Sequence, residues 1–128
     1  MRSAPFTRPT LVAAVELLEQ HSQARFNQMV LRLGLEDEIS SSTSISVANK
    51  CGLLGRIVVQ RAEAVLDTLE GSMTLGEAVT RQAAQLAQQD PTHALQTAFA
   101  RGLARDGYVL TWDDYGRNAS IRAALPGE

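Results

Sequence analysis

The side chains that could perform catalysis or bind a metal are few and widely spaced in this chain. His21 and His93 are the only imidazoles, and Cys51 is the only cysteine. Histidine ligands of metals normally occur in clusters, and neither histidine has a ligand set among its neighbours in sequence. A cysteine nucleophile needs a base beside it, whereas Cys51 falls on an apolar helical stripe with Val47 and Leu54. These residues therefore predict no metal site and no nucleophilic site.

Two clusters of acidic residues are the remaining candidates for catalysis or metal binding. Asp113 and Asp114 are adjacent, and Glu36, Asp37 and Glu38 form an acidic run. Paired catalytic carboxylates need a pocket that raises one pKa, and both groups fall in segments typical of solvated turns or loops. The phosphate-loop, G-x-S-x-G, H-E-x-x-H and EF-hand patterns are absent. We expect no catalytic residue, metal ligand or cofactor, and a small enzyme whose site assembles only in three dimensions is a third hypothesis.

Basic residues are the stronger candidates for contacts with another molecule. Between Ile39 and Ala62 the chain carries Lys50, Arg56 and Arg61 and no acid. This segment follows another helix and a turn, as the recognition helix of a DNA-binding domain does. The same distribution is typical of a solvated helix face, and the preceding connection is long and begins acidic. The sequence leaves both interpretations open.

Further candidate contacts lie near the end of the chain. Arg117 and Arg122 would add phosphate contacts, but Asp113 and Asp114 would repel phosphate. Tyr115 is the kind of aromatic residue that anchors a protein interface. The formal net charge of −2 also argues against a strongly nucleic-acid-binding surface overall.

Apolar residues at helical spacing, interrupted by capping and stop residues, predict the elements that position these groups. Ser22 and either Ser44 or Ser46 suit helix N-caps, and Gly34 and Gly107 suit the positions that follow helix ends. The first three expected helices cover residues 9–21, residues 23–33, and a segment that begins at 47. A fourth follows a capping box at 74–77 and runs to about 89, and a fifth is begun by Asp90 and Pro91. Between these helices, segment 36–46 is expected to be a loop, 56–60 also suits a strand, and 61–71 continues as helix or compact turn.

The last stretch of the chain predicts two strands joined by a polar turn. Side chains alternate in character over 108–112 and again over 119–124, and residues 113–118 are turn-forming as a group. A lone two-stranded ribbon is marginal in water. One face of this ribbon must therefore pack on the helices.

The whole chain is expected to form one domain over residues 1–128. Its fold class is mainly α: a single compact bundle of about five helices, closed by a C-terminal β-hairpin over 108–125 in a winged-helix-like arrangement. Tyr108, Leu110 and Ile121 are expected to seal the helical core.

The composition favours a bacterial, cytoplasmic protein. The start, MRSAPFTRPT, has no apolar signal core, and no apolar run approaches the length of a membrane span. The lone cysteine can form no intrachain disulfide and fits a reducing compartment. Arginine supplies every basic residue except Lys50, which together with the many alanines is typical of a GC-rich bacterial genome. We expect no contact with a membrane.

Four stretches of the chain, taken in order, are LLEQHSQARFNQMVLRLGLE, SVANKCGLLGRIV, MTLGEAV and LARDGYVLTWDDYGRNASIRAALP. Together they resemble helical, winged-helix-like modules that lie beside effector domains in bacterial abortive-infection and other antiphage defence proteins. Most of the likeness lies in the closing pattern of helix, Asp-Gly-Tyr, strand, turn and strand ending in Leu-Pro. The resemblance implies an adaptor or sensor that recruits or restrains an effector, and it implies no catalytic residue.

The sequence as a whole favours a non-catalytic module for protein–protein interaction or regulation. Its partner would be another protein or effector domain, or a second copy of the chain in a homodimer. The alternative is a winged-helix-like transcriptional regulator that binds DNA. The candidate contact residues for either function are Lys50, Arg56, Arg61, Tyr115, Arg117 and Arg122.

Overall fold

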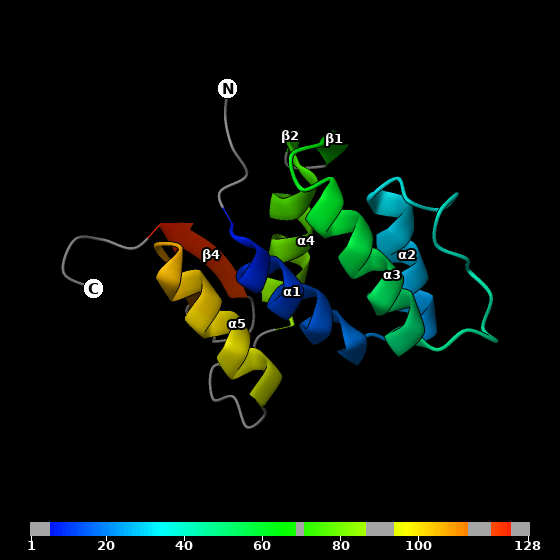
Figure 1. Cartoon of the computed structure of the whole chain (residues 1–128), viewed down its shortest axis with the longest axis horizontal. Helices are drawn as coiled ribbons and strands as arrows, with labels where there is room; N and C mark the ends of the chain where they lie inside the picture. The colour runs from blue at the N-terminus through cyan, green and yellow to red at the C-terminus, as the bar shows by residue number, and fades with distance from the viewer. Residues whose placement is uncertain (1–5, 69–70, 87–93, 113–118, 124–128) are drawn as a thin grey trace.

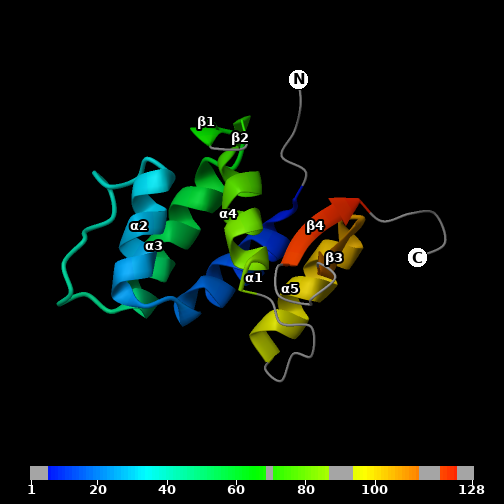
Figure 2. The ribbon, with the colours of Figure 1, turned by 180° about the vertical axis from the view of Figure 1, so that it is seen from behind.

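Helices α1, α3 and α5 lie side by side in one layer, with α1 in the middle, and α4, α2 and the C-terminal hairpin lie behind them (Figures 1 and 2). This computed structural model describes residues 6–68, 71–86, 94–112 and 119–123. The described part is mainly α with a C-terminal strand pair, as the sequence predicts. Its elements are α1 (Arg8–Leu17), a 3₁₀ turn (Leu18–Gln20), α2 (Gln23–Arg32), α3 (Val47–Gln60), β1 (Val65–Thr68), β2 (Gly71–Thr74), α4 (Leu75–Ala84), α5 (Ala94–Arg105), β3 (Tyr108–Trp112) and β4 (Ala119–Ala123).

Helix α1 is central because most of its surface is apolar and many of its side chains are small. Ala14 and Leu17 are fully buried, and α1 contacts α3, α4 and α5. Its closest approach is to α5, where Gly102 faces Thr10. A Cβ added to Gly102 would lie 2.7 Å from Thr10 Oγ1 and 3.0 Å from Thr10 Cα. The absence of a side chain at Gly102 therefore sets the distance between α1 and α5.

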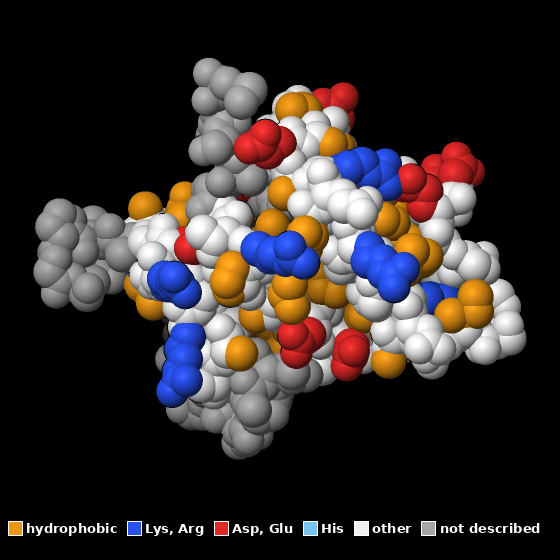
Figure 3. Space-filling view, viewed as in Figure 1, with side chains coloured by type: hydrophobic (Ala, Val, Ile, Leu, Met, Phe, Trp, Pro, Cys, Tyr) orange, Lys and Arg blue, Asp and Glu red, His pale blue; other side chains and the backbone are white. Residues whose placement is uncertain are grey.

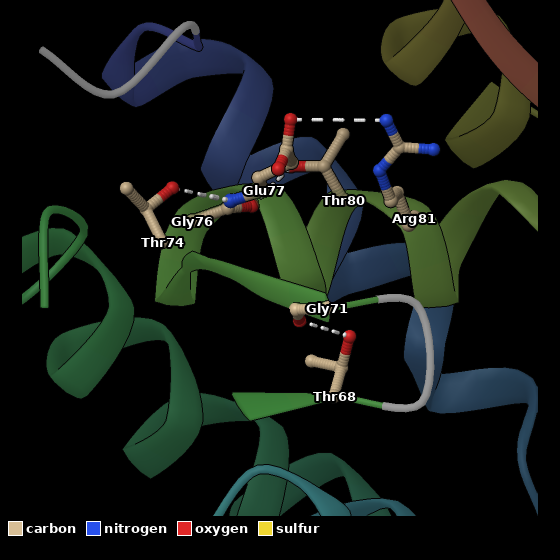
Figure 4. Close-up of polar contacts among 7 residues, drawn as sticks. All are labelled: Thr68, Gly71, Thr74, Gly76, Glu77, Thr80 and Arg81. Atoms are coloured by element: carbon tan, nitrogen blue, oxygen red, sulfur yellow. Dashed lines mark hydrogen bonds and ion pairs between the residues drawn. The ribbon is translucent and has the colours of Figure 1, made fainter. Parts of the chain in front are cut away.

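The helix-capping predictions are confirmed where the structure describes them. Ser22 and Ser46 accept hydrogen bonds from backbone N–H groups at the starts of α2 and α3. Thr74 does the same for α4, with its Oγ1 accepting from the Glu77 N–H at 3.2 Å (Figure 4). The second half of that expected capping box is replaced by an ion-pair contact, in which Glu77 lies 3.7 Å from the Arg81 guanidinium.

Helix α2 ends in a Schellman motif at the predicted glycine. Gly34 has a φ of +72°, its N–H donates to the Leu31 carbonyl, and the Leu35 N–H donates to the Val30 carbonyl, each at 3.1 Å. Leu35 folds back and is buried. The loop expected over 36–46 follows, and α3 begins at Val47 as predicted.

For residues 61–71 the helix alternative was wrong: residues 61–64 form a turn, and residues 65–68 are extended. The chain forms a β-hairpin there, in which Val65 pairs with Thr74 and Thr68 with Gly71. The side chain of Thr68 donates to the Gly71 carbonyl at 2.8 Å, and Gly71 adopts a φ of +108° that favours glycine (Figure 4). Only alternate residues of β1 pack inward, which suits a strand better than a helix.

Two helix boundaries also differ from expectation. Helix α1 ends at Leu17 and passes into the 3₁₀ turn, because the chain must turn a corner before the cap at Ser22. Helix α4 ends at Ala84. Gln85 and Leu86 form a turn in place of the expected helix, whereas residues 87–89 and the cap at Asp90 and Pro91 lie outside the described residues.

The C-terminal hairpin packs on the helices as predicted. Strands β3 and β4 are antiparallel, with Tyr108 opposite Ala123 and Leu110 opposite Ile121. Tyr108, Leu110 and Ile121 are partly buried against the hydrophobic core. Because side chains alternate along a strand, these three share the inward face of the ribbon.

The Asp-Gly-Tyr motif joins the two ends of the described chain. The Asp106 carboxylate accepts hydrogen bonds from the Thr7 N–H at 2.9 Å and from the Thr10 hydroxyl at 2.6 Å, at the start of α1. Gly107 adopts a φ of +88° between α5 and β3. The ring of Tyr108 packs on that of Phe6, with centroids 4.8 Å apart. The Asp-Gly-Tyr motif thus has a structural role.

Candidate partner-contact surface

Lys50 is not part of an exposed basic surface, contrary to its place among the candidate contacts. Only 2% of the residue is accessible to solvent. Its Nζ donates to Gln23 Oε1 at 2.7 Å and to Asn27 Oδ1 at 3.0 Å. The two carboxamides in turn donate to the carbonyls of Ile45 and Ser41. Lys50 therefore orients two amides that hold the serine-rich loop against α2.

The other predicted contact residues that the structure describes do not converge on one site. Arg56 is exposed on α3, and Arg61 at the end of α3 forms an ion pair with Glu38. Arg122 lies on β4, which Figures 1 and 2 place at the opposite end of the molecule from α3, with α1 between them. Tyr115 and Arg117 lie outside the described residues.

Cys51 and His21 both have shifted pKa values in the folded chain. Burial raises the pKa of the Cys51 thiol to about 12, and Glu19 adds to the shift, so the thiolate is scarce at neutral pH. Burial also lowers the pKa of His21, and Arg25 and Arg32 lower it further. Among the described residues, no three His, Cys, Asp or Glu side chains are grouped as metal ligands would be. His93, Asp113 and Asp114 lie outside the described residues.

One face of the molecule carries basic side chains that the sequence analysis did not bring together. Figure 3 shows Lys and Arg side chains over α5, α1 and α3, with acidic side chains toward the upper and lower margins. We call this surface the contact face. The exposed arginines of these three helices are Arg8 on α1, Arg56 on α3, and Arg101 and Arg105 on α5. Within the described part of the chain, none of these four guanidinium groups forms an ion pair.

Part of this face was detectable in the sequence. Arg101 and Arg105 are four residues apart, so they share one side of a helix that carries no acid. The proximity of Arg8 was not detectable, because it depends on the packing of α1 between α3 and α5.

Apolar side chains interrupt the basic residues of the contact face. Val12 on α1 and Leu53 on α3 are 38% and 40% exposed, one turn from Arg8 and Arg56 respectively. Arginine mixed with exposed aliphatic side chains is typical of protein interfaces, in which arginine is enriched and lysine depleted.

A groove of about 520 Å³ opens between the start of α1 and the end of α3. Phe6 and Leu11 contribute apolar surface, and Arg8 and Arg61 supply positive charge. Glu63 also lines the groove. The groove therefore combines two guanidinium groups with an apolar wall and one opposing carboxylate.

A second cavity of about 460 Å³ lies between the end of α2, the β1–β2 hairpin and α4. Its lining includes Leu33, Met73 and Ala78, together with Arg32 and Asp67. Arg81 also borders this cavity. In Figure 4 its guanidinium is directed toward Glu77, away from Thr68. The Arg81 guanidinium is thus paired with a carboxylate of its own helix.

Comparison with known proteins gives no match: no family model, no curated protein and no solved structure matches the chain. None of the described helices has the length and apolar character needed to cross a membrane.

Proposed function

We propose that this domain is a non-catalytic module for protein–protein interaction, acting as an adaptor or regulator in a bacterial cytosolic, antiphage-defence system. The observation that supports the proposal is the contact face: α1, α3 and α5 carry four exposed arginines without ion pairs in the described structure, and exposed Val12 and Leu53 lie one turn from Arg8 and Arg56. Exposed apolar groups within a ring of charge are what a partner surface buries on binding. The partner is another protein or effector domain with an acidic surface.

Charge reversal on the contact face tests the proposal. The double variant Arg56→Glu, Arg101→Glu should fold normally and lose at least about tenfold in affinity for the partner, because like charges then face each other. Arg25→Glu, at an exposed position of α2, is the matched control and should bind like the wild type. The partner is isolated with the wild-type chain and titrated against all three proteins. If the double variant binds as tightly as the control, the contact face is not the interface.

The order of elements favours DNA binding as a second candidate function. Helix α5 is followed directly by the β3–β4 ribbon, as a recognition helix is followed by a wing, and α5 rather than α3 then takes the recognition role. Arg101 and Arg105 would contact phosphate groups. This function predicts that affinity for nonspecific duplex DNA falls steeply with salt, through counterion release. Absence of duplex binding at low salt would eliminate it.

A further inference from the structure

We propose that the groove between α1 and α3 binds an acidic segment of another protein, and that a carboxylate of this segment replaces Glu38 at Arg61. The inference rests on the proposed interaction function and names the partner's chemistry at one part of the molecule. The segment carries an acidic side chain next to an apolar one. The carboxylate contacts Arg61 and Arg8, and the apolar side chain packs against Phe6 and Leu11.

The ion pair between Arg61 and Glu38 shows which ligand chemistry this site accepts. Glu38 comes from the acidic loop after α2, and its carboxylate contacts Arg61 Nη2. The two side chains are 41% and 45% exposed, so solvent reaches both of them. An exposed ion pair contributes little to stability. Exchange of Glu38 for a partner's carboxylate therefore costs little.

The groove offers such a segment more than Glu38 now uses. Arg8 lines the same groove and forms no ion pair with any described residue. A guanidinium group can form two parallel hydrogen bonds with a carboxylate. Phe6 and Leu11 border the groove but are only 6% and 3% exposed, so they form a narrow apolar wall. A side chain that covers this wall removes apolar surface from water.

The same groove disfavours a nucleic acid. Glu63 lines it and Glu38 pairs with Arg61, and both carboxylates repel a phosphate backbone, which is charged along its whole length. A peptide places a single carboxylate at the guanidinium groups and leaves apolar groups elsewhere. Charge complementarity and the apolar wall together favour the acidic protein segment.

The test uses a short fluorescent peptide that alternates glutamate with leucine, and the same peptide with glutamine in place of glutamate. Binding is measured by fluorescence anisotropy at physiological salt. Chemical shifts of backbone amides in the full chain locate the site. Glu38→Gln should bind the acidic peptide about two- to five-fold more tightly, because an exposed competing ion pair is removed. Arg61→Gln and Arg8→Gln should each weaken binding about five- to ten-fold.

Arg25→Gln is the matched control and should leave peptide binding unchanged. All variants alter exposed side chains, and circular dichroism verifies that each is folded. The inference is overturned if the glutamine peptide binds as well as the glutamate peptide. It is also overturned if the Glu38→Gln substitution leaves the affinity for the acidic peptide unchanged. Two further outcomes overturn the inference: the wild-type chain binds neither peptide, or the Glu38→Gln variant mainly self-associates and does not bind the peptide.

The outcomes also separate this inference from the proposed function. Suppose that peptide binding depends on Arg56 and Arg101 but not on Glu38 or Arg61. This result overturns the groove as the binding site and leaves the proposed interaction function intact. Duplex DNA that displaces the peptide, with steep salt dependence, overturns both.

Discussion

Lys50 illustrates how a charged residue can be used to position a loop. Its ammonium group is buried and contacts two carboxamide oxygens rather than a carboxylate. The amides of Gln23 and Asn27 are thereby oriented so that their N–H groups hold Ile45 and Ser41. A basic residue on a helix that looked solvent-exposed in sequence is thus part of the interior.

Replacement of Lys50 by Met tests this role. Methionine retains the apolar stem but leaves the two amide oxygens without their donor, so we expect a loss of about 1–3 kcal/mol in the free energy of unfolding. Hydrogen exchange of the loop over 41–46 should also become faster. Arg56→Met, on the exposed side of the same helix, is the control and should change stability by no more than about 0.5 kcal/mol. Equal effects of the two substitutions would contradict the structural role of Lys50.

Cys51 provides a prediction about pH at the same scale. Its thiol has a pKa of about 12 in the folded chain, against 9.0 for an unperturbed thiol. The folded state therefore holds this proton more tightly, and its stabilising contribution is complete below pH 9 and is lost as the pH rises to about 12.

Two measurements check this behaviour. A thiol reagent at pH 8 should modify Cys51 only when denaturant is added. The free energy of unfolding should fall more steeply above pH 9 in the wild type than in Cys51→Ala. Rapid modification of the folded protein at pH 8 would show that the thiol is accessible.

At the scale of elements, the contact between α1 and α5 depends on a missing side chain. Gly102→Ala places a Cβ within 3.0 Å of the Thr10 backbone, so the helices must separate, and we expect a loss of about 1–3 kcal/mol. Gly52→Ala on α3 is the matched control, because a Cβ there meets nothing within 4 Å. It should stabilise the domain by about 0.5–1 kcal/mol through helix propensity. Urea denaturation measures both, and a neutral Gly102→Ala would show that the helices can adjust.

At the scale of the whole molecule, contacts link the start of α1 to the junction of α5 with β3, about a hundred residues later. The start of α1 is bound by Asp106, and Phe6 packs on Tyr108, so the segment before α1 and the junction of α5 with β3 support each other. The C-terminal hairpin in turn covers part of the helical core. If the inward face of the C-terminal hairpin no longer packs on the helices, the stability of the entire domain should therefore fall.

Leu110→Asp tests this cooperativity. A carboxylate on the inward face of β3 cannot be solvated without detaching the ribbon from the helices, so we expect the cooperative unfolding transition to be lost. Ser120→Asp introduces the same charge at an exposed position of β4 and should leave the transition nearly unchanged. Calorimetry distinguishes the two variants. A sharp transition in Leu110→Asp would contradict the packing of the ribbon.

The features determined by local sequence were predictable. Ser22, Ser46, Thr74 and Gly34 act on backbone groups within a few residues, so their identity alone indicates where helices begin or end. The alternation of side chains likewise indicated the C-terminal ribbon and its inward face. These interactions are short in sequence and do not depend on how the helices pack.

Other features were decided only by tertiary structure. Three features depend on which helices become neighbours: the burial of Lys50, the β1–β2 hairpin, and the grouping of Arg8 with Arg56 and Arg101. A sequence pattern specifies which side of a helix is apolar, but not which element covers that side. The helices and the ribbon follow from local physics, whereas the contact face and its groove exist because α1 lies between α3 and α5.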